Sequence, residues 1–355
     1  MRRSIVFTGG GTAGHVTVNL ALIPYFQVQG WDVHYIGSQQ GIERELISGF
    51  PDVHYHSIST GKLRRYMDWN NVKDPFRVIK GLWQTYRLLA QLRPHVIFSK
   101  GGFVSVPVIA GAWLHRIPSI IHESDLTPGL ANRVSIPFAT QLCTTFPETG
   151  EMIKSDKVVY LGAIIRRELF AGEATRGLAL CQFVRTKPVL LIMGGSLGSQ
   201  RINQVIRNVL PLLCSKFQII HICGKGNVLP ELESRTYRQF EFVKNELADL
   251  LASTDLVLSR AGSNSIFEFL ALKKPMLLIP LSSAASRGDQ IANAESFRKR
   301  GFASVLAEEE CTDETLLAEL DVLWARRAEI IAAMDQQFRN DATQSLIKLI
   351  EKIAK

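Results

Sequence analysis

The sequence predicts an α/β protein built from two doubly wound parallel sheets. Short apolar, β-branched runs alternate with helical stretches along all 355 residues, as expected of buried parallel strands joined by crossover helices. A glycine-rich turn after the first expected strand, Gly10–Gly14, has a counterpart in the second half at Gly194–Gly198. A chain of this length exceeds one ordinary core, so the repeat indicates two similar, Rossmann-like domains.

The expected strands are the short apolar runs of each half. In the first half they are Ser4–Thr8, Asp32–Ile36, Val96–Ser99, Ser119–His122 and Val158–Leu161. In the second half they are Val189–Met193, Gln218–Cys223, Phe240–Val243, Asp255–Ser259 and Met276–Pro280. We therefore expect one domain over residues 1–161 and another over 162–336, with Gly162–Gly177 as a linker. The last helical stretch, about residues 337–355, is long enough to pack back on the first domain.

The first glycine-rich turn fits a phosphate-binding pattern. Gly9, Gly11 and Gly14 satisfy G-x-G-x-x-G, but the second expected strand runs into Gly37-Ser38 without the acid that a dinucleotide site places on the ribose. A dehydrogenase is therefore not expected. Glycine N–H groups and a helix N-terminus still suit a phosphate. Ligands of open parallel sheets lie beyond the carboxyl ends of the strands, so we expect the site in a cleft between the domains.

Composition excludes several classes of protein. The chain has 46% hydrophobic and 21% charged residues, as a globular protein does, and no apolar run long enough to cross a membrane. Its five cysteines are scattered without disulfide or zinc spacing, and Met1–Phe7 does not begin a signal peptide. There is also no D-x-D to hold a metal on a diphosphate. We expect a cytosolic protein without cofactor or metal, in which backbone amides, helix dipoles and Arg166 or Arg260 neutralise a leaving diphosphate.

Positive charge is concentrated in one stretch of the first half. Between Gly61 and Lys100 nine cations face two aspartates, so this stretch carries +7 of the net charge of +8. Such a field indicates an anionic partner, and the absence of any nucleic-acid-binding motif favours phosphates or anionic lipid over nucleic acid.

A helix is expected within that stretch, from the N-cap Asp74 to Leu92. Helical spacing places one apolar stripe in the core: Val78, Ile79, Leu82, Tyr86 and Leu89. A second set combines aromatic residues with cations, as an interfacial contact does, although its aromatic members could instead pack inside the domain. Its members are Phe76, Lys80, Trp83 and Arg87, and Trp113 could extend it.

Two ionisable residues stand next to expected turns. His15 follows the first glycine turn at a helix start, which favours a neutral imidazole able to accept a proton. It could equally cap or pack locally. Glu268 lies in the first turns of a helix, where it could complement the helix dipole or bind two ribose hydroxyls.

In an ordered set of motifs along nearly the whole chain, the sequence resembles glycosyltransferase family 28, in particular its peptidoglycan N-acetylglucosaminyltransferases. The matching segments are Gly9–His15, Gly101–Ser105, His122-Glu123-Ser124, Gly194-Gly195-Ser196, Arg260–Ser263 with Glu268, and Asp289-Gln290 with Asn293. The resemblance implies a GT-B fold and inverting, metal-independent transfer of N-acetylglucosamine from UDP-N-acetylglucosamine. The acceptor would be the C4 hydroxyl of the muramyl sugar of lipid I, at the cytoplasmic face of the cell membrane.

The resemblance also implies residue roles near the acceptor. Thr12, Gly14 and His15 would lie in the cleft, with His15 as the candidate base for the acceptor hydroxyl. Asp125 occupies a position where many members have asparagine and is a second candidate base; the sequence leaves the choice open.

Further residues would bind the donor. Arg166 and Ser196 would approach the diphosphate, and Arg260 and Ser263 belong to the same donor motif as Glu268, which would hold the ribose. Val243 would offer its backbone to uracil. Gln290 and Asn293 would contact the sugar hydroxyls. Asp289 belongs to the same motif but stands at a position where glutamine is common.

Three alternatives remain open at this point. A related GT-B enzyme could glycosylate another lipid, and a UDP-N-acetylglucosamine epimerase shares the two-domain form without needing a lipid-facing surface. A non-catalytic UDP-sugar-binding protein would bind donor without turnover.

Overall fold

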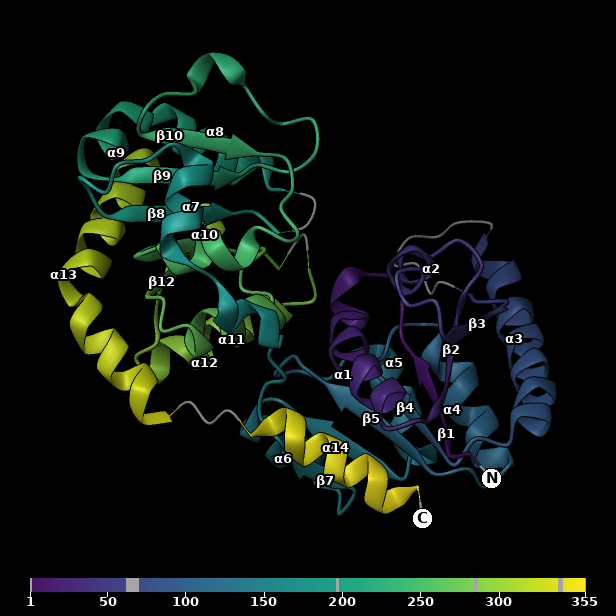
Figure 1. Cartoon of the computed structure of the whole chain (residues 1–355). Helices are drawn as coiled ribbons and strands as arrows, with labels where there is room; N and C mark the ends of the chain where they lie inside the picture. Colours follow the sequence, from purple (N-terminus) through teal and green to yellow (C-terminus); the bar gives the residue numbers. More distant parts are fainter. Residues whose placement is uncertain (1, 62–69, 196–197, 284–285, 338–340, 355) are drawn as a thin grey trace. The chain divides into compact units, whose positions relative to one another are not determined.

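The computed structural model describes residues 2–61, 70–195, 198–283, 286–337 and 341–354 (Figure 1). The chain divides into two compact units. Unit 1 is Met1–Ile164 with Asp341–Lys355, and unit 2 is Ile165–Asn340. Each unit is an α/β fold with one parallel sheet, which confirms the predicted class.

Unit 1 contains a seven-stranded sheet of order β3-β2-β1-β4-β5-β6-β7. Its strands are β1 (Ser4–Thr8), β2 (Asp32–Ser38), β3 (Val53–Ile58), β4 (Val96–Ser99), β5 (Ser119–Glu123), β6 (Gln141–Thr144) and β7 (Val158–Tyr160). Its helices are α1 (Thr17–Val28), α2 (Ile42–Ile47), α3 (Asn70–Leu92), α4 (Ser105–Leu114), α5 (Leu130–Ser135), α6 (Pro147–Ile153) and α14 (Ala342–Ile353). The chain turns from β3 back past β1 to β4, so the topological switch point lies between β1 and β4.

Unit 2 contains a six-stranded sheet of order β10-β9-β8-β11-β12-β13. Its strands are β8 (Val189–Met193), β9 (Gln218–Ile222), β10 (Tyr237–Phe240), β11 (Leu256–Ser259), β12 (Met276–Leu278) and β13 (Ala303–Val305). Its helices are α7 (Ala174–Cys181), α8 (Gln200–Asn208), α9 (Leu210–Lys216), α10 (Leu247–Ser253), α11 (Ser263–Ala271), α12 (Asp289–Lys299) and α13 (Asp313–Gln337). The corresponding switch point lies between β8 and β11.

Nine of the ten predicted strands are present at or near their predicted positions. The exception is Phe240–Val243, because β10 ends where that prediction begins. Three strands were not predicted, namely β3, β6 and β13. β3 reads Val-His-Tyr-His-Ser-Ile and lies at the sheet edge, where it does not need the continuous apolar run of a central strand.

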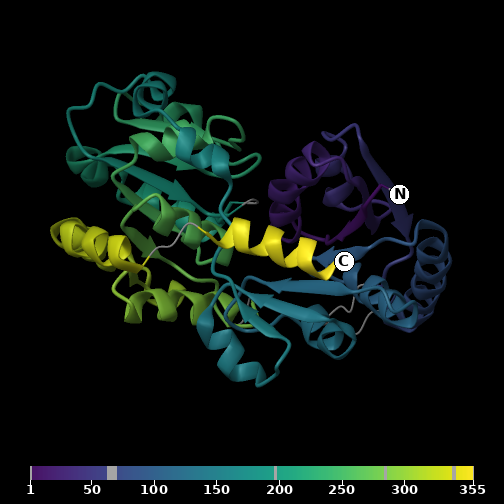
Figure 2. The ribbon, with the colours of Figure 1, turned by 60° about the horizontal axis from the view of Figure 1, so that its bottom comes forward.

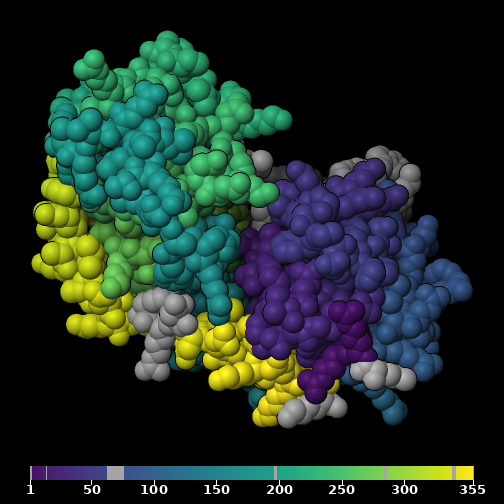
Figure 3. Space-filling model, in the orientation of Figure 1, coloured from purple at the N-terminus to yellow at the C-terminus, as the bar shows by residue number. Residues whose placement is uncertain are grey.

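The last helix completes the core of unit 1. Leu346, Ile347 and Ile350 of α14 belong to the same buried cluster as Ile5 and Phe7 of β1. Figure 2 shows α14 lying along this sheet, and in Figure 3 the yellow C-terminal residues lie next to the purple N-terminal residues of the same unit. The chain therefore returns to its first unit after completing the second.

Candidate functional site

In unit 1, the loops after β1 and β5 carry the candidate bases, and β4 is the strand between these two. These three strands are neighbours in the sheet, so the loops after them share its carboxyl edge. The loops after β1 and β4 also touch, since a Cβ on Gly102 would lie 2.2 Å from the carbonyl oxygen of Gly10. Only glycine allows this approach of one loop backbone to the other.

His15 is held by the glycine loop itself. It ends the short 3-10 turn Ala13–His15, two residues before α1. Its Nδ1 lies 3.1 Å from the carbonyl oxygen of Gly10 and 3.1 Å from Oγ1 of the exposed Thr12. A carbonyl oxygen can only accept, so Nδ1 carries the proton and Nε2 carries the lone pair of the neutral ring. This is the tautomer that a base acting through Nε2 requires.

Asp125 lies in the loop after β5, half-buried beside two buried charges. Its backbone N–H donates to Oε1 of Glu123 at 3.0 Å. Glu123 also accepts from Gly129 N at 2.8 Å and Asn132 Nδ2 at 2.9 Å. These bonds fix the loop that carries Asp125.

The third member of this charge cluster is Lys100, which follows β4. It is only 2% exposed, and its Nζ donates to Ser124 Oγ at 2.7 Å. Burial lowers the pKa of Lys100, and the charges of Glu123 and Asp125 oppose that shift. Burial likewise raises the pKa of Glu123, with Asp125 raising it further and Lys100 opposing. Lys100 therefore belongs to this buried cluster rather than to the basic surface where its place in the sequence had put it.

In unit 2, three helices begin at the carboxyl edge of the sheet. The parallel register pairs Met193 of β8 with Ser259 of β11 and Ser259 with Leu278 of β12. Each of these strands leads, through a loop, into one of α8, α11 and α12, and Ser263 and Asp289 are the first residues of the last two. Backbone N–H groups and helix dipoles thus gather at one edge, which favours an anion there. The predicted Ser196 lies outside the described residues.

Arg260 stands at the centre of this edge but is occupied by internal contacts. Its guanidinium donates to Ser199 Oγ at 2.8 Å, to the carbonyl oxygen of Ile279 at 3.1 Å and to a carboxylate oxygen of Glu308. Ser199 is the N-cap of α8 and accepts from Ile202 N. Arg260 therefore positions the start of α8 and is neutralised by Glu308.

Arg166 and Glu268 form a bidentate pair within unit 2. Arg166 Nε lies 2.8 Å from Glu268 Oε1, and Arg166 Nη2 lies 3.1 Å from Glu268 Oε2. Their side chains are 25% and 10% exposed. Burial raises the pKa of Glu268, and Arg166 opposes that shift. The sequence suggested separate partners for these residues on the donor, whereas here each is the other's partner.

The predicted sugar-binding residues connect loops at the same edge. Gln290 Oε1 accepts from the N–H of Leu281 at 3.1 Å and of Ala261 at 3.3 Å. The fully buried Asn293 donates to the carbonyl oxygen of Ala261 at 3.2 Å. Val243 is buried in the loop after β10. These residues thus lie at or next to the edge where α11 and α12 begin.

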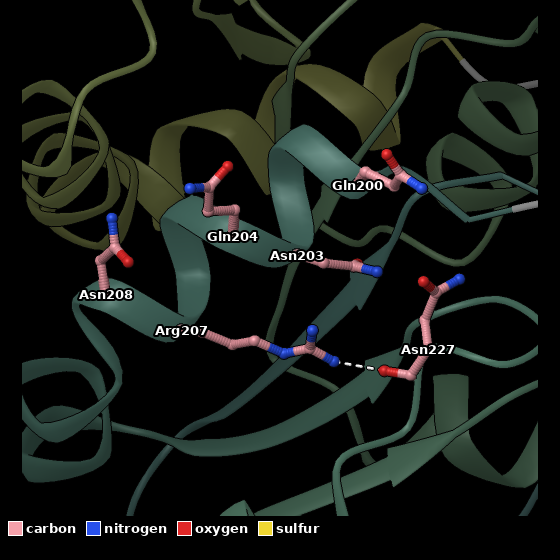
Figure 4. Close-up of a pocket in the computed structure, with 6 residues that line it drawn as sticks. All are labelled: Gln200, Asn203, Gln204, Arg207, Asn208 and Asn227. Carbon is pink, nitrogen blue, oxygen red and sulfur yellow. Dashed lines mark hydrogen bonds between the residues drawn. The ribbon is translucent and has the colours of Figure 1, made fainter.

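A polar pocket of about 370 Å³ lies beside α8. Its lining residues are Gln200, Asn203, Gln204, Arg207, Asn208 and Asn227. Figure 4 shows the guanidinium of Arg207 pointing toward Asn227, whose carbonyl oxygen it contacts. None of the predicted donor residues lines this pocket, and Arg207 connects α8 to the loop that follows β9.

The outer face of α3 exposes aromatic and basic side chains. Phe76 is 72% exposed and Trp83 57% exposed, with the guanidinium of Arg87 4.9 Å from the Trp83 ring centroid. Lys80 is also exposed, and Trp113 of α4 is 55% exposed. The alternative in which Phe76 and Trp83 are core residues is therefore wrong.

Two other expectations for α3 need correction. The helix begins at Asn70 rather than after Asp74, and Ile79 and Tyr86, expected in the core, are 64% and 45% exposed. Leu89 of that stripe is buried as predicted, and the smaller Gly81 and Thr85 share the buried side with it. A Cβ on Gly81 would lie 2.2 Å from the carbonyl oxygen of Ser59.

Within the described part of the chain, no group of three His, Cys, Asp or Glu side chains is placed to hold a metal ion. No helix there is both long and apolar enough to span a bilayer.

Comparisons with known proteins match both halves of the chain. The glycosyltransferase family 28 N-terminal domain matches residues 5–144, and the family 28 C-terminal domain matches residues 189–350. A UDP-N-acetylglucosamine–N-acetylmuramyl-(pentapeptide) pyrophosphoryl-undecaprenol N-acetylglucosamine transferase of Geobacillus thermodenitrificans is 59% identical, over 100% of both chains. A transferase of the same name from Oceanobacillus iheyensis is 56% identical, over 99% of both chains.

Solved structures share the fold. The crystal structure of MurG from Acinetobacter baumannii superposes with a TM-score of 0.77 at 24% identity, over 99% of both chains. A glycosyltransferase of kitacinnamycin superposes with a TM-score of 0.78 at 17% identity, over 100% of both chains. The predicted GT-B fold is confirmed.

Proposed function

Because the chain belongs to glycosyltransferase family 28, we propose that it transfers N-acetylglucosamine from UDP-N-acetylglucosamine to lipid I. The acceptor is the C4 hydroxyl of the N-acetylmuramyl sugar on pyrophosphoryl-undecaprenol, and the products are lipid II and UDP. The observation that carries this function is the full-length identity of 59% to a transferase named for this reaction. Family membership and the two parallel-sheet units support it.

The chemistry follows from the residues at the two sheet edges. The acceptor hydroxyl attacks the anomeric carbon from the face opposite UDP, so the configuration inverts and one base is sufficient. We assign that base to His15, whose Nδ1 is held by the Gly10 carbonyl oxygen at 3.1 Å. The helix N-termini of unit 2 stabilise the charge that develops on the departing diphosphate.

The donor-binding roles are proposals of the same kind. Glu268 binds the ribose hydroxyls, Val243 offers its backbone to uracil, and Ser196 contacts the diphosphate. Arg166 supports the site by fixing the Glu268 carboxylate, and Arg260 supports it by fixing the N-cap of α8. Gln290 contacts the sugar through its amide group, and Asn293 and Asp289 shape the loop beside it.

Transfer of labelled N-acetylglucosamine from UDP to a lipid I analogue, measured in EDTA, tests this function. We expect turnover, since no metal is required by the roles assigned here. Donor binding without transfer to lipid I, but with transfer to another lipid, would indicate a related glycolipid enzyme. Conversion of the donor to its epimer would identify an epimerase, and donor binding with no reaction would indicate a binding protein.

We also propose that unit 1 binds the membrane surface through the exposed face of α3. Phe76, Trp83 and Trp113 would enter the interface while Lys80 and Arg87 contact anionic headgroups. Aromatic side chains beside cations are what such a contact needs. A lipid acceptor requires a peripheral position at a membrane surface, and we propose that this is the cytoplasmic face of the cell membrane.

Replacing Lys80 and Arg87 with glutamine is expected to weaken binding to anionic vesicles about thirtyfold, because each surface cation contributes about 1 kcal/mol. Raising the salt concentration should reduce wild-type binding in the same way. Vesicle co-sedimentation measures both effects. Leu212→Ala, at a side chain 56% exposed on α9 of unit 2, is the control and should bind normally. Salt-independent binding, or equal loss in the control, would contradict the proposal.

A further inference from the structure

Glu43 is a buried carboxylate for which the sequence analysis predicted no role. It lies in the first turn of α2 and is 0% exposed. Its Oε1 accepts from Ser38 N at 2.9 Å and from Ser38 Oγ at 2.5 Å, and its Oε2 accepts from Gly11 N at 3.1 Å. The carboxylate therefore joins the end of β2 to the glycine loop after β1.

The backbone packs so closely around this carboxylate that positions 10 and 41 have no room for a side chain. A Cβ on Gly10 would lie 2.5 Å from Cδ of Glu43, and a Cβ on Gly41 would lie 2.2 Å from its oxygens. Real Cβ atoms do not approach other atoms so closely. Glycine at both positions therefore allows the carboxylate to reach the loop.

One peptide group connects Glu43 to His15. The Gly11 N–H that donates to Glu43 and the Gly10 carbonyl oxygen that meets His15 Nδ1 at 3.1 Å belong to the same planar peptide unit. Its N–H and C=O point in opposite directions, so a carboxylate on one side fixes a carbonyl oxygen on the other. If this peptide were reversed, an N–H would face His15 and would favour the opposite tautomer.

A second partner of the ring, Thr12, is compatible with either tautomer. Its Oγ1, 3.1 Å from Nδ1, can donate or accept. Tyr35 donates to the carbonyl oxygen of Gly9 at 2.7 Å, which belongs to the preceding peptide. The hydrogen bond from Gly11 N to Glu43 thus acts directly on the Gly10–Gly11 peptide, whereas that from Tyr35 acts on the peptide before it.

We propose that Glu43 is a positioning residue for the transfer reaction, which acts through the Gly10–Gly11 peptide to hold His15 with its proton on Nδ1. The inference rests on the proposed function for the role of His15 as the base. The arrangement itself resembles a carboxylate that orients a histidine, with a peptide group inserted between them.

The test compares Glu43→Gln with wild type by 15N NMR of histidine-labelled protein, in which the His15 signals are identified from a His15→Gln variant. The glutamine keeps the shape of the side chain, and with its oxygen on the two Ser38 donors it presents an NH2 group to the Gly11 N–H. We expect the wild-type ring to have its proton on Nδ1 and the variant to lose that preference. We expect kcat to fall about 10- to 100-fold, as small misplacements of catalytic groups do, with the Kd for UDP-N-acetylglucosamine unchanged.

Tyr35→Phe is the matched control, because it removes a hydrogen bond from the same loop but not from the Gly10–Gly11 peptide. It should keep the wild-type tautomer. If Glu43→Gln does not fold, Glu43→Asp retains the charge but is one methylene too short to span Ser38 and Gly11, and the same loss is expected. An unchanged tautomer in the Glu43 variant, or an equal change in Tyr35→Phe, would overturn the inference. The NMR result needs no substrate, so it stands apart from a failure of the transfer assay.

Discussion

Glu268→Ala is expected to weaken binding of UDP-N-acetylglucosamine by about a hundredfold or more. The carboxylate is placed on α11 with both oxygens fixed by Arg166 at 2.8 and 3.1 Å, so in the proposed role it would bind a ribose without reorganisation. Each hydrogen bond to a charged group contributes about 1.5–3 kcal/mol, and the alanine removes two. Isothermal titration calorimetry with UDP-N-acetylglucosamine measures the loss, which should appear in Kd rather than in kcat at saturating donor.

The variant also leaves Arg166 without its carboxylate, so a control must separate binding from stability. Asp255 pairs with Arg185 at 2.6 Å and accepts from Val189 N at 2.8 Å, at the amino ends of β8 and β11. Asp255→Ala should therefore destabilise unit 2 by a comparable mechanism while leaving the donor Kd unchanged. A normal Kd in Glu268→Ala, or an equal loss in Asp255→Ala, would refute the assigned role.

The central strands and the glycine turns could be predicted because local sequence determines them. β1, β4 and β8 are continuous apolar runs that are buried on both faces, and their predicted bounds are the observed ones. The edge strand β3 carries two histidines and a tyrosine, which no hydropathy pattern separates from a loop. Its place depends on pairing with β2, a contact between distant parts of the chain.

Buried charges were the main features of the site that sequence could not supply. Lys100 was counted with the surface cations because isolated lysines are almost always exposed. It is buried beside Glu123 at the end of β5 and beside Ser124 and Asp125 in the loop after it. Glu43 escaped notice for the same reason, since its three donors come from β2 and the glycine loop. The sequence features connected with its burial are the glycines at positions 10 and 41, which leave space for its carboxylate.

The exposed face of α3 shows a second limit of prediction from sequence. Helical spacing placed large apolar residues inward, yet Gly81 and Thr85 are buried while Ile79 and Tyr86 are exposed. A Cβ on Gly111 of α4 would lie 2.9 Å from Cγ2 of Thr85 and 3.5 Å from Cδ1 of the buried Leu89, so α4 packs closely against this side of α3. Periodicity predicts that one face is apolar, but only packing decides which face is buried.

His15→Gln is expected to lower kcat about 100- to 10,000-fold, the usual contribution of a general base, with the donor Kd within about twofold of wild type. Glutamine can still donate to the Gly10 carbonyl oxygen but offers no basic nitrogen, so the loop is kept while proton transfer is lost. Single-turnover transfer to a lipid I analogue measures this step directly.

Asp125→Asn decides between the two candidate bases. The amide keeps the shape of the side chain in a loop already held by Glu123, Gly129 and Asn132, so folding should be preserved. With His15 as the base, the asparagine should cost less than about tenfold, since only a nearby charge is removed from the developing positive charge at the anomeric carbon. The opposite ranking, with Asp125→Asn slower than His15→Gln, would assign proton removal to Asp125. In that case His15 would orient the acceptor hydroxyl instead.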